Sequence, residues 1–151
     1  MDLADFSGAI LGFANLNGVT TKDGPWADFH GAHLGRATLV QARLEHARFR
    51  DAGFDSVNAD QAVLSWADFQ HANLRRTRFK HAELSHAKFR GANMTHVDLT
   101  SADLRGANFT RADLRGADFT GADLRKAVLT DVCFDQRTKW GSNSPPASSS
   151  C

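Results

Sequence analysis

Large apolar residues return at every fifth position along most of this chain. From Ser101 to Arg125 the sequence reads SADLRGANFTRADLRGADFTGADLR, in which Ala, then Asp or Asn, then Leu or Phe recurs without a break. An α-helix repeats its apolar face every 3.6 residues and a half-buried strand every 2, so neither element fits. The pattern predicts a third kind of structure, built from five-residue units. Each unit has Leu or Phe at its centre and a small residue two positions before it.

The units form two runs. The first run has four units, with centres from Phe6 to Thr21, and the second has 22 in one unbroken register from Ala27 to about Phe134, which makes 26 in all. Between the runs, residues 21–26 add three extra positions around Gly24 and Pro25, which we interpret as a bulged turn rather than a domain linker. The sequence thus predicts one domain over residues 1–140, followed by a Ser/Pro-rich tail at 141–151 whose composition favours disorder.

The tandem A-[DN]-[LF]-x-x units resemble the pentapeptide-repeat family from Ala4 to about Phe134. The resemblance implies an all-β fold, a right-handed quadrilateral β-helix with four units per coil. In that fold the centre and the small residue point inward and the other three residues outward. For 26 units it implies about 6.5 coils. The segment FDQRTKW also looks like the end of many family members, so we expect Thr138, Lys139 and Trp140 to fold across the last coil.

A second feature of the sequence independently supports four units per coil. Residues 20 positions apart would then stack on one face, and centres at that spacing share their identity. A column of Leu centres runs from Leu44 to Leu124, and the next column is Phe until Leu129 ends it. Stacked rings inside a narrow rod produce such a column. The predicted core stack is Phe6, Phe29, Phe49, Phe69, Phe89 and Phe109.

Composition narrows the class of protein. The chain has 18 Lys and Arg against 17 Asp and Glu, so it is neither a polyanion nor a general nucleic-acid binder. No apolar run approaches the ~20 residues of a membrane helix, and the N-terminus lacks the features of a secretory signal. Two cysteines are too few for a disulfide framework, and Cys133 reads as an unreactive surface thiol. We therefore expect a cytoplasmic protein without direct membrane contact.

Catalysis and metal binding are not predicted. His46 and His86 would lie two coils apart, about 10 Å, whereas two ligands of one zinc ion each lie ~2 Å from it. No Ser-His-Asp set, glycine-rich phosphate loop or carboxylate pair stands out from the Asp that belongs to the repeat. A filled rod also presents faces rather than clefts. The sequence predicts no enzyme and no cofactor.

Two sets of outward-facing residues are candidate partner-binding sites. The first places aromatic or imidazole rings at coil spacing along one corner, and it comprises Trp26, His46, Trp66 and His86. Exposed Trp is frequent in interface hot spots, although such rings can also merely stack and shield a corner. The second is a basic collar between His71 and Arg90, which has six bases against Glu83. Its central members are Arg75, Arg76, Arg78 and Lys80, and it could hold phosphate, an acidic protein or nucleic acid, or be simply solvated.

We interpret the chain as a non-catalytic binding or scaffold element with a protein partner. A nucleic-acid partner is not expected, because no aromatic residues interleave with the collar. The alternative comes from the resemblance: some family members mimic DNA, bind DNA gyrase and protect it from quinolones. Mimicry requires a sustained negative surface, whereas Asp-Leu-Arg at 103–105, 113–115 and 123–125 sets each acid beside a base. The sequence names neither the partner nor the oligomeric state.

Overall fold

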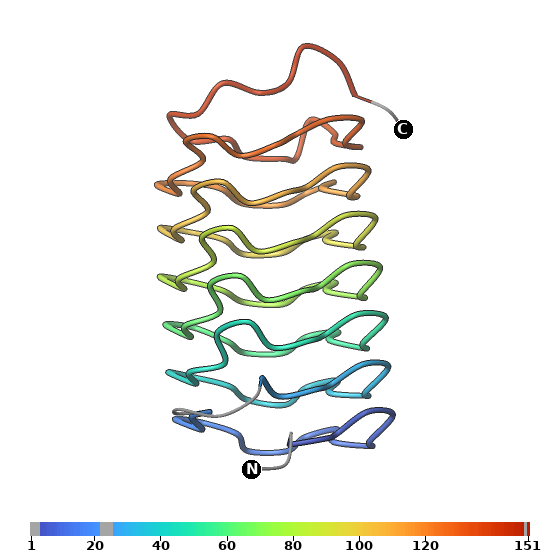
Figure 1. The fold of residues 1–151 in the computed structure, drawn as a ribbon. Coiled ribbons are helices and arrows are strands. Elements are labelled where there is room, and N and C mark those ends of the chain that lie inside the picture. The colour runs from blue at the N-terminus through green and yellow to red at the C-terminus, as the bar shows by residue number, and fades with distance from the viewer. Residues whose placement is uncertain (1–3, 22–25, 150) are drawn as a thin grey trace.

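The backbone winds as a rod of stacked coils, from the N-terminal end drawn in blue to the C-terminal end drawn in red (Figure 1). This computed structural model describes residues 4–21, 26–149 and 151, so most of the bulged turn predicted at 21–26 lies outside the described residues. Within these ranges there is no helix and no strand longer than one residue. The sheet-like faces are instead made of isolated parallel bridges between coils. The described residues accordingly contain no helix that could cross a membrane.

The bridges fix the register of the coils. The residue before each centre pairs with its counterpart 20 positions later, as in Asp28 with Arg48, and 23 positions later across the insertion, as in Asp5 with Asp28. The Phe29 amide donates to the Arg48 carbonyl at 2.7 Å, and the Arg48 amide donates to the Ala27 carbonyl at 3.0 Å. Four units per coil are therefore confirmed, while the total of 6.5 coils stays a prediction.

Each corner is a tight turn. The small residue that opens a unit donates its amide to the carbonyl of the preceding centre, as Ala32 does to Phe29 at 3.0 Å. The residue before that donor has positive φ, which is the pattern of a type II turn. Gly31 fills this position at φ 63°, but His46 at φ 61° and Trp66 at φ 64° also adopt it. Residues other than glycine rarely adopt positive φ, so the hydrogen bonds between coils must offset a local cost in backbone strain at such corners.

The predicted core is confirmed. Rings in the Phe column lie parallel at centroid distances of 4.8 to 5.4 Å, from Phe6 through to Phe109. Phe69 is completely buried, whereas Phe6, in the first coil, is 39% exposed. Ala fills most of the small positions between the columns; where Thr77 replaces it, the hydroxyl donates to the Phe54 carbonyl at 2.6 Å. Every buried side-chain polar atom in the described residues has a partner.

Trp140 covers the C-terminal end of the core, as the sequence predicts. Its ring stacks on Phe119 at 5.1 Å and meets the Phe134 ring edge-on at 5.5 Å. Asp118 bridges Lys139, a spacing of 21 rather than 20, so the last turn contains one extra residue. The Thr138 hydroxyl fits into this turn and donates to the Leu114 carbonyl at 3.0 Å.

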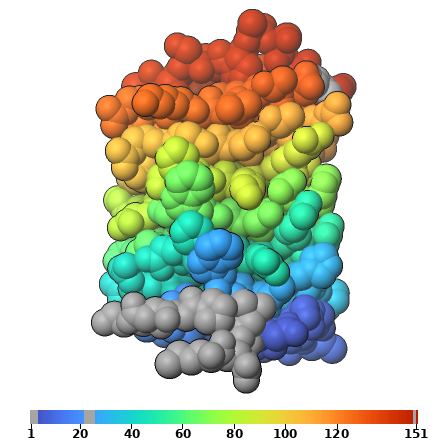
Figure 2. Space-filling model, viewed as in Figure 1, coloured from blue at the N-terminus to red at the C-terminus, as the bar shows by residue number. Residues whose placement is uncertain are grey.

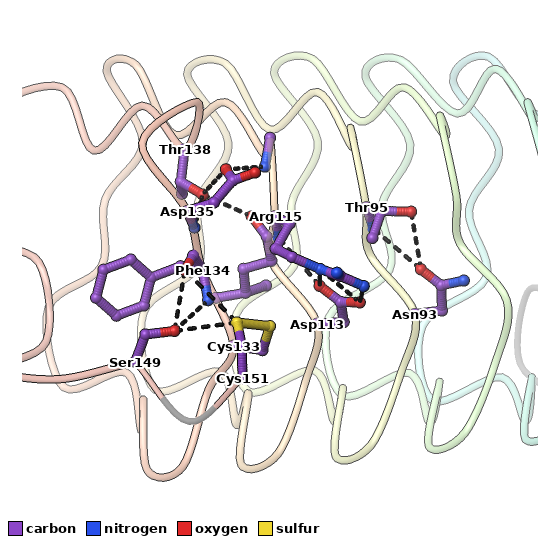
Figure 3. A network of polar contacts seen from close by, with 12 residues as sticks. Asn93, Thr95, Asp113, Arg115, Cys133, Phe134, Asp135, Thr138, Ser149 and Cys151 are labelled. Atoms are coloured by element: carbon purple, nitrogen blue, oxygen red, sulfur yellow. Dashed lines mark hydrogen bonds and ion pairs between the residues drawn. A yellow bond between two sulfur atoms is a disulfide. The ribbon is translucent and has the colours of Figure 1, made fainter.

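The prediction that Cys133 is a surface thiol is wrong. Cys133 forms a disulfide with Cys151, because the tail turns back along the last coil (Figure 3). The side-chain amide of Asn143 donates to the Ala122 carbonyl at 3.1 Å. The Ser149 hydroxyl accepts from the Phe134 backbone amide and donates to the Phe134 carbonyl. The structure thus gives residues 141–149 a defined path, while the disorder expected from composition stays a prediction about the tail in solution.

Candidate partner-binding groove

A ladder of parallel rings follows one corner of the rod. The centroid distances are 4.7 Å from Trp26 to His46, 6.1 Å from His46 to Trp66 and 4.2 Å from Trp66 to His86. The interplanar angles do not exceed 14°. The stack arises because the coil repeats every 20 residues and places the same corner position of successive coils side by side. About half of each Trp side chain remains exposed, 49% for Trp26 and 48% for Trp66.

The ladder ends where the chain has glycine. A Cβ atom at Gly106 would lie 2.7 Å from both Nδ1 and Cε1 of His86, so the imidazole lies against the bare backbone of the next coil. His86 is therefore held between Trp66 on one side and Gly106 on the other. This packing fixes the orientation of the last ring.

An open groove of about 670 Å³ runs beside the ladder. Its near wall is Trp26, His46 and Trp66. Its floor is the outward-facing row of the Phe-column face, which comprises Asp28, Arg48, Asp68 and Lys88. Its far wall is the next corner, which carries His30, Arg50 and Asp51. In the space-filling view, side chains from several consecutive coils protrude in a column on the face toward the viewer (Figure 2).

Charges of both signs cover the groove. Arg48 lies 3.4 Å from Asp28, Arg50 lies 3.8 Å from Asp68, and His30 lies 3.8 Å from Asp51. Lys88 has no ion pair within 4 Å among the described residues. The groove is thus a mixed polar surface with one aromatic edge, suited to a segment that itself carries acids, bases and an apolar side chain.

In the described part of the chain, two of the four central residues of the basic collar form ion pairs and two do not. Arg78 is in close contact with the Asp60 carboxylate, and Lys80 lies 3.2 Å from Asp98. Arg75 and Arg76 have no carboxylate within 4 Å among the described residues. Counting acids only between His71 and Arg90 missed both partners. Both acids lie on the adjacent coils, 18 positions from their partners, with Asp60 before Arg78 and Asp98 after Lys80. An exact spacing of 20 would instead have paired Asp60 with Lys80 and Asp98 with Arg78.

The Asp-Leu-Arg units form the ion pairs that the sequence predicts. The Arg and Asp atoms lie 2.7 Å apart at 103–105, and 2.6 Å apart at 113–115 and at 123–125. The hydrogen bond from Arg125 lowers the pKa of Asp123 to about 2. Hydrogen bonding to Arg105 likewise lowers the pKa of Asp103. These acids are matched by bases, so they do not form a sustained negative surface.

Metal ligands do not converge in the described part of the chain. No three His, Cys, Asp or Glu side chains there lie close enough to one another to hold an ion. The histidines are instead spread along corners and faces, and those of the ladder are used for stacking.

Four five-residue sides per coil, a filled core and outward-facing polar rows define a β-solenoid repeat protein. The family model described as Pentapeptide repeats (8 copies) matches residues 27–65, 60–95 and 92–131. The chain belongs to the pentapeptide-repeat family. Proteins of this family are right-handed quadrilateral β-helices and are generally structural or binding proteins rather than enzymes.

Solved structures that are similar to this chain come from varied sources. A trypsin-treated variant of QnrB1, a plasmid-mediated fluoroquinolone resistance protein, is 23% identical, with 92% of this chain and 73% of that one covered and a TM-score of 0.56. HetL, a protein involved in heterocyst differentiation regulation in the cyanobacterium Nostoc, is 26% identical over 85% of this chain and 73% of its own, with a TM-score of 0.37. A thylakoid-lumen pentapeptide repeat protein of Arabidopsis thaliana is 29% identical over 74% and 68%, with a TM-score of 0.38. No curated protein sequence matches the chain.

Proposed function

We propose that this protein is a non-catalytic binding element that holds a protein partner in the groove beside the ring ladder. The observation that supports the proposal is the pair of half-exposed Trp side chains fixed along one edge of a 670 Å³ groove. Ordered, exposed Trp binds a partner at little cost in conformational entropy, since its rings are already stacked.

The floor of the groove favours protein over nucleic acid. Asp28 and Asp68 alternate with Arg48 and Lys88 along it, so a continuous phosphate backbone would meet a carboxylate at every second coil. A polypeptide segment with both kinds of charge complements the same row.

Capture from an extract of the native cell tests the proposal. Tagged protein is compared with Trp66→Ala, which removes one ring, and with Gln61→Ala, which removes an exposed side chain at the same turn position of the preceding corner. We expect Trp66→Ala to lose a captured protein that Gln61→Ala retains. Equal capture by all three would contradict a role for the ladder.

Gyrase modulation is the alternative that this experiment must separate. The likeness to QnrB1 is a likeness of fold, and the acids of the Asp-Leu-Arg units are paired with bases. We expect DNA supercoiling by gyrase, with and without a quinolone, to be unchanged when the protein is added. Protection of gyrase would replace the present proposal with the alternative.

A further inference from the structure

A second surface lies on the face that follows the Phe column. Its outward row contains Asn73 and Asn93, which bridge each other on adjacent coils, and then Asp113. We call the part around Asn73 and Asn93 the amide face. It does not overlap the lining of the groove beside the ring ladder.

The turn geometry settles which way the two amides face. The Oδ1 atom of Asn93 accepts from the Thr95 amide at 3.2 Å and from its hydroxyl at 2.9 Å. The Oδ1 atom of Asn73 accepts from the Arg75 amide at 3.4 Å. Each NH₂ group therefore lies on the side away from its turn, as Figure 3 shows for Asn93. Neither NH₂ group donates a hydrogen bond to another described residue.

Three arginines lie beside Asn93. A hollow of about 350 Å³ contains Asn93 and is otherwise lined by Arg75, Thr95, His96, Asp113, Arg115 and Arg137. Arg115 pairs with Asp113 at 2.6 Å and Arg137 with Asp135 at 2.7 Å, while Arg75 has no carboxylate within 4 Å among the described residues. The lining of the hollow thus offers one guanidinium that has no ion pair within the described ranges and one amide donor, and its one carboxylate is already paired with Arg115.

We propose that the amide face binds the carboxylates of an extended acidic peptide. The NH₂ groups of Asn73 and Asn93 project from neighbouring coils, whose backbones lie about 4.8 Å apart. Together with the Arg75 guanidinium they present donors to a carboxylate, and hydrogen bonds to charged groups are the strong ones. Nucleic acid fits less well, because no Phe or Trp of the described residues lines the hollow to stack a base, and the imidazole of His96, which does line it, lies against the backbone of Gly116. The proposal does not depend on the groove.

One substitution separates the donor from the fold. Asn93→Asp keeps an oxygen for Thr95 but replaces the NH₂ group with a second, negatively charged oxygen. The chain already uses this arrangement at Asp98, whose Oδ1 accepts from the Thr100 amide at 3.1 Å and from its hydroxyl at 2.6 Å. Asn108→Asp is the matched control, because Asn108 makes the same two contacts with Thr110 on a different face.

The experiment measures fluorescence anisotropy of labelled octaglutamate at low salt, with octaglutamine and oligothymidylate as comparison probes. We expect octaglutamate to bind, Asn93→Asp to weaken it about tenfold, Arg75→Gln to weaken it severalfold, and Asn108→Asp to change it less than twofold. An equal loss in the two Asp variants would overturn the site, since net charge alone would explain it. Unchanged binding in Asn93→Asp, or tighter binding of oligothymidylate than of octaglutamate, would also overturn the proposal.

Discussion

The imidazole of His86 lies against Gly106 so closely that a methyl group on that glycine would come within 2.7 Å of its Nδ1 atom. On its other side the same imidazole stacks on Trp66 at 4.2 Å. A residue without a side chain in one coil thus determines where a ring of the previous coil lies.

Gly106→Ala should therefore destabilise the rod in two ways. The new Cβ meets the imidazole, and alanine is strained at φ 68°, which costs on the order of 1 kcal/mol by itself. Gly31→Ala is the control, because Gly31 has a φ of 63° but no atom lies within 4 Å of the place that its new methyl group would take. We expect a larger loss of unfolding free energy for Gly106→Ala, together with a change in Trp fluorescence. Equal losses in the two variants would mean that His86 moves aside freely.

The Phe column should be most sensitive at its middle. Phe69 is completely buried and contacts four other rings, which are Phe49, Phe54, Phe79 and Phe89. Phe69→Ala should lower the free energy of unfolding by about 3 to 5 kcal/mol. Phe6→Ala should cost clearly less, since Phe6 is 39% exposed and stacks on Phe29 alone. Denaturant titrations measure both, and similar costs would contradict a stack that is continuous and most buried at its middle.

Acid should loosen the C-terminal cap. Hydrogen bonding from Arg137, together with the Gly116 and Arg137 amides, lowers the pKa of Asp135 to about 2. Because the folded pKa lies below the ordinary value of 3.8, the stabilisation is present above about pH 4 and is lost as the pH falls toward 2. Trp140 packs at this end, so its fluorescence should change over that window. Asp135→Asn should remove the transition, and an identical acid transition in that variant would assign it to another group.

The disulfide should control the tail. Purified protein should contain no free thiol, and reduction should release residues 141–149, which then become sensitive to protease and exchange their amides rapidly. Cys133→Ser should reproduce the reduced behaviour without reductant. A tail that stays protected after reduction would show that the Asn143 and Ser149 hydrogen bonds are sufficient to hold it.

The thiol assay also bears on location. Disulfides persist mainly in oxidising surroundings, so the bond between Cys133 and Cys151 argues against the cysteine-based part of the expectation of a cytoplasmic protein. That expectation stays a prediction, and the thiol state of the protein taken directly from its cells tests it.

Much of this protein could be predicted from its residues alone, because a repeat of five with four units per coil converts sequence spacing into spatial neighbourhood. The Phe column and the Trp and His ladder follow from the 20-residue spacing, since each member is brought to the same position of the next coil. The ion pairs of Arg78 and Lys80 also join adjacent coils, but their partners lie 18 rather than 20 positions away, so the spacing alone does not predict which acid pairs with which base.

The sequence predicts that Trp140 covers the C-terminal end, but only the tertiary structure decided how the chain ends there. There the period fails: one extra residue moves Trp140 into the column above Phe119, and the tail then reverses to bring Cys151 to Cys133. Spacing predicts contacts only while the period lasts. Beyond it, the path of the chain depends on which buried ring, backbone carbonyl and sulfur atom the last coil leaves to be covered.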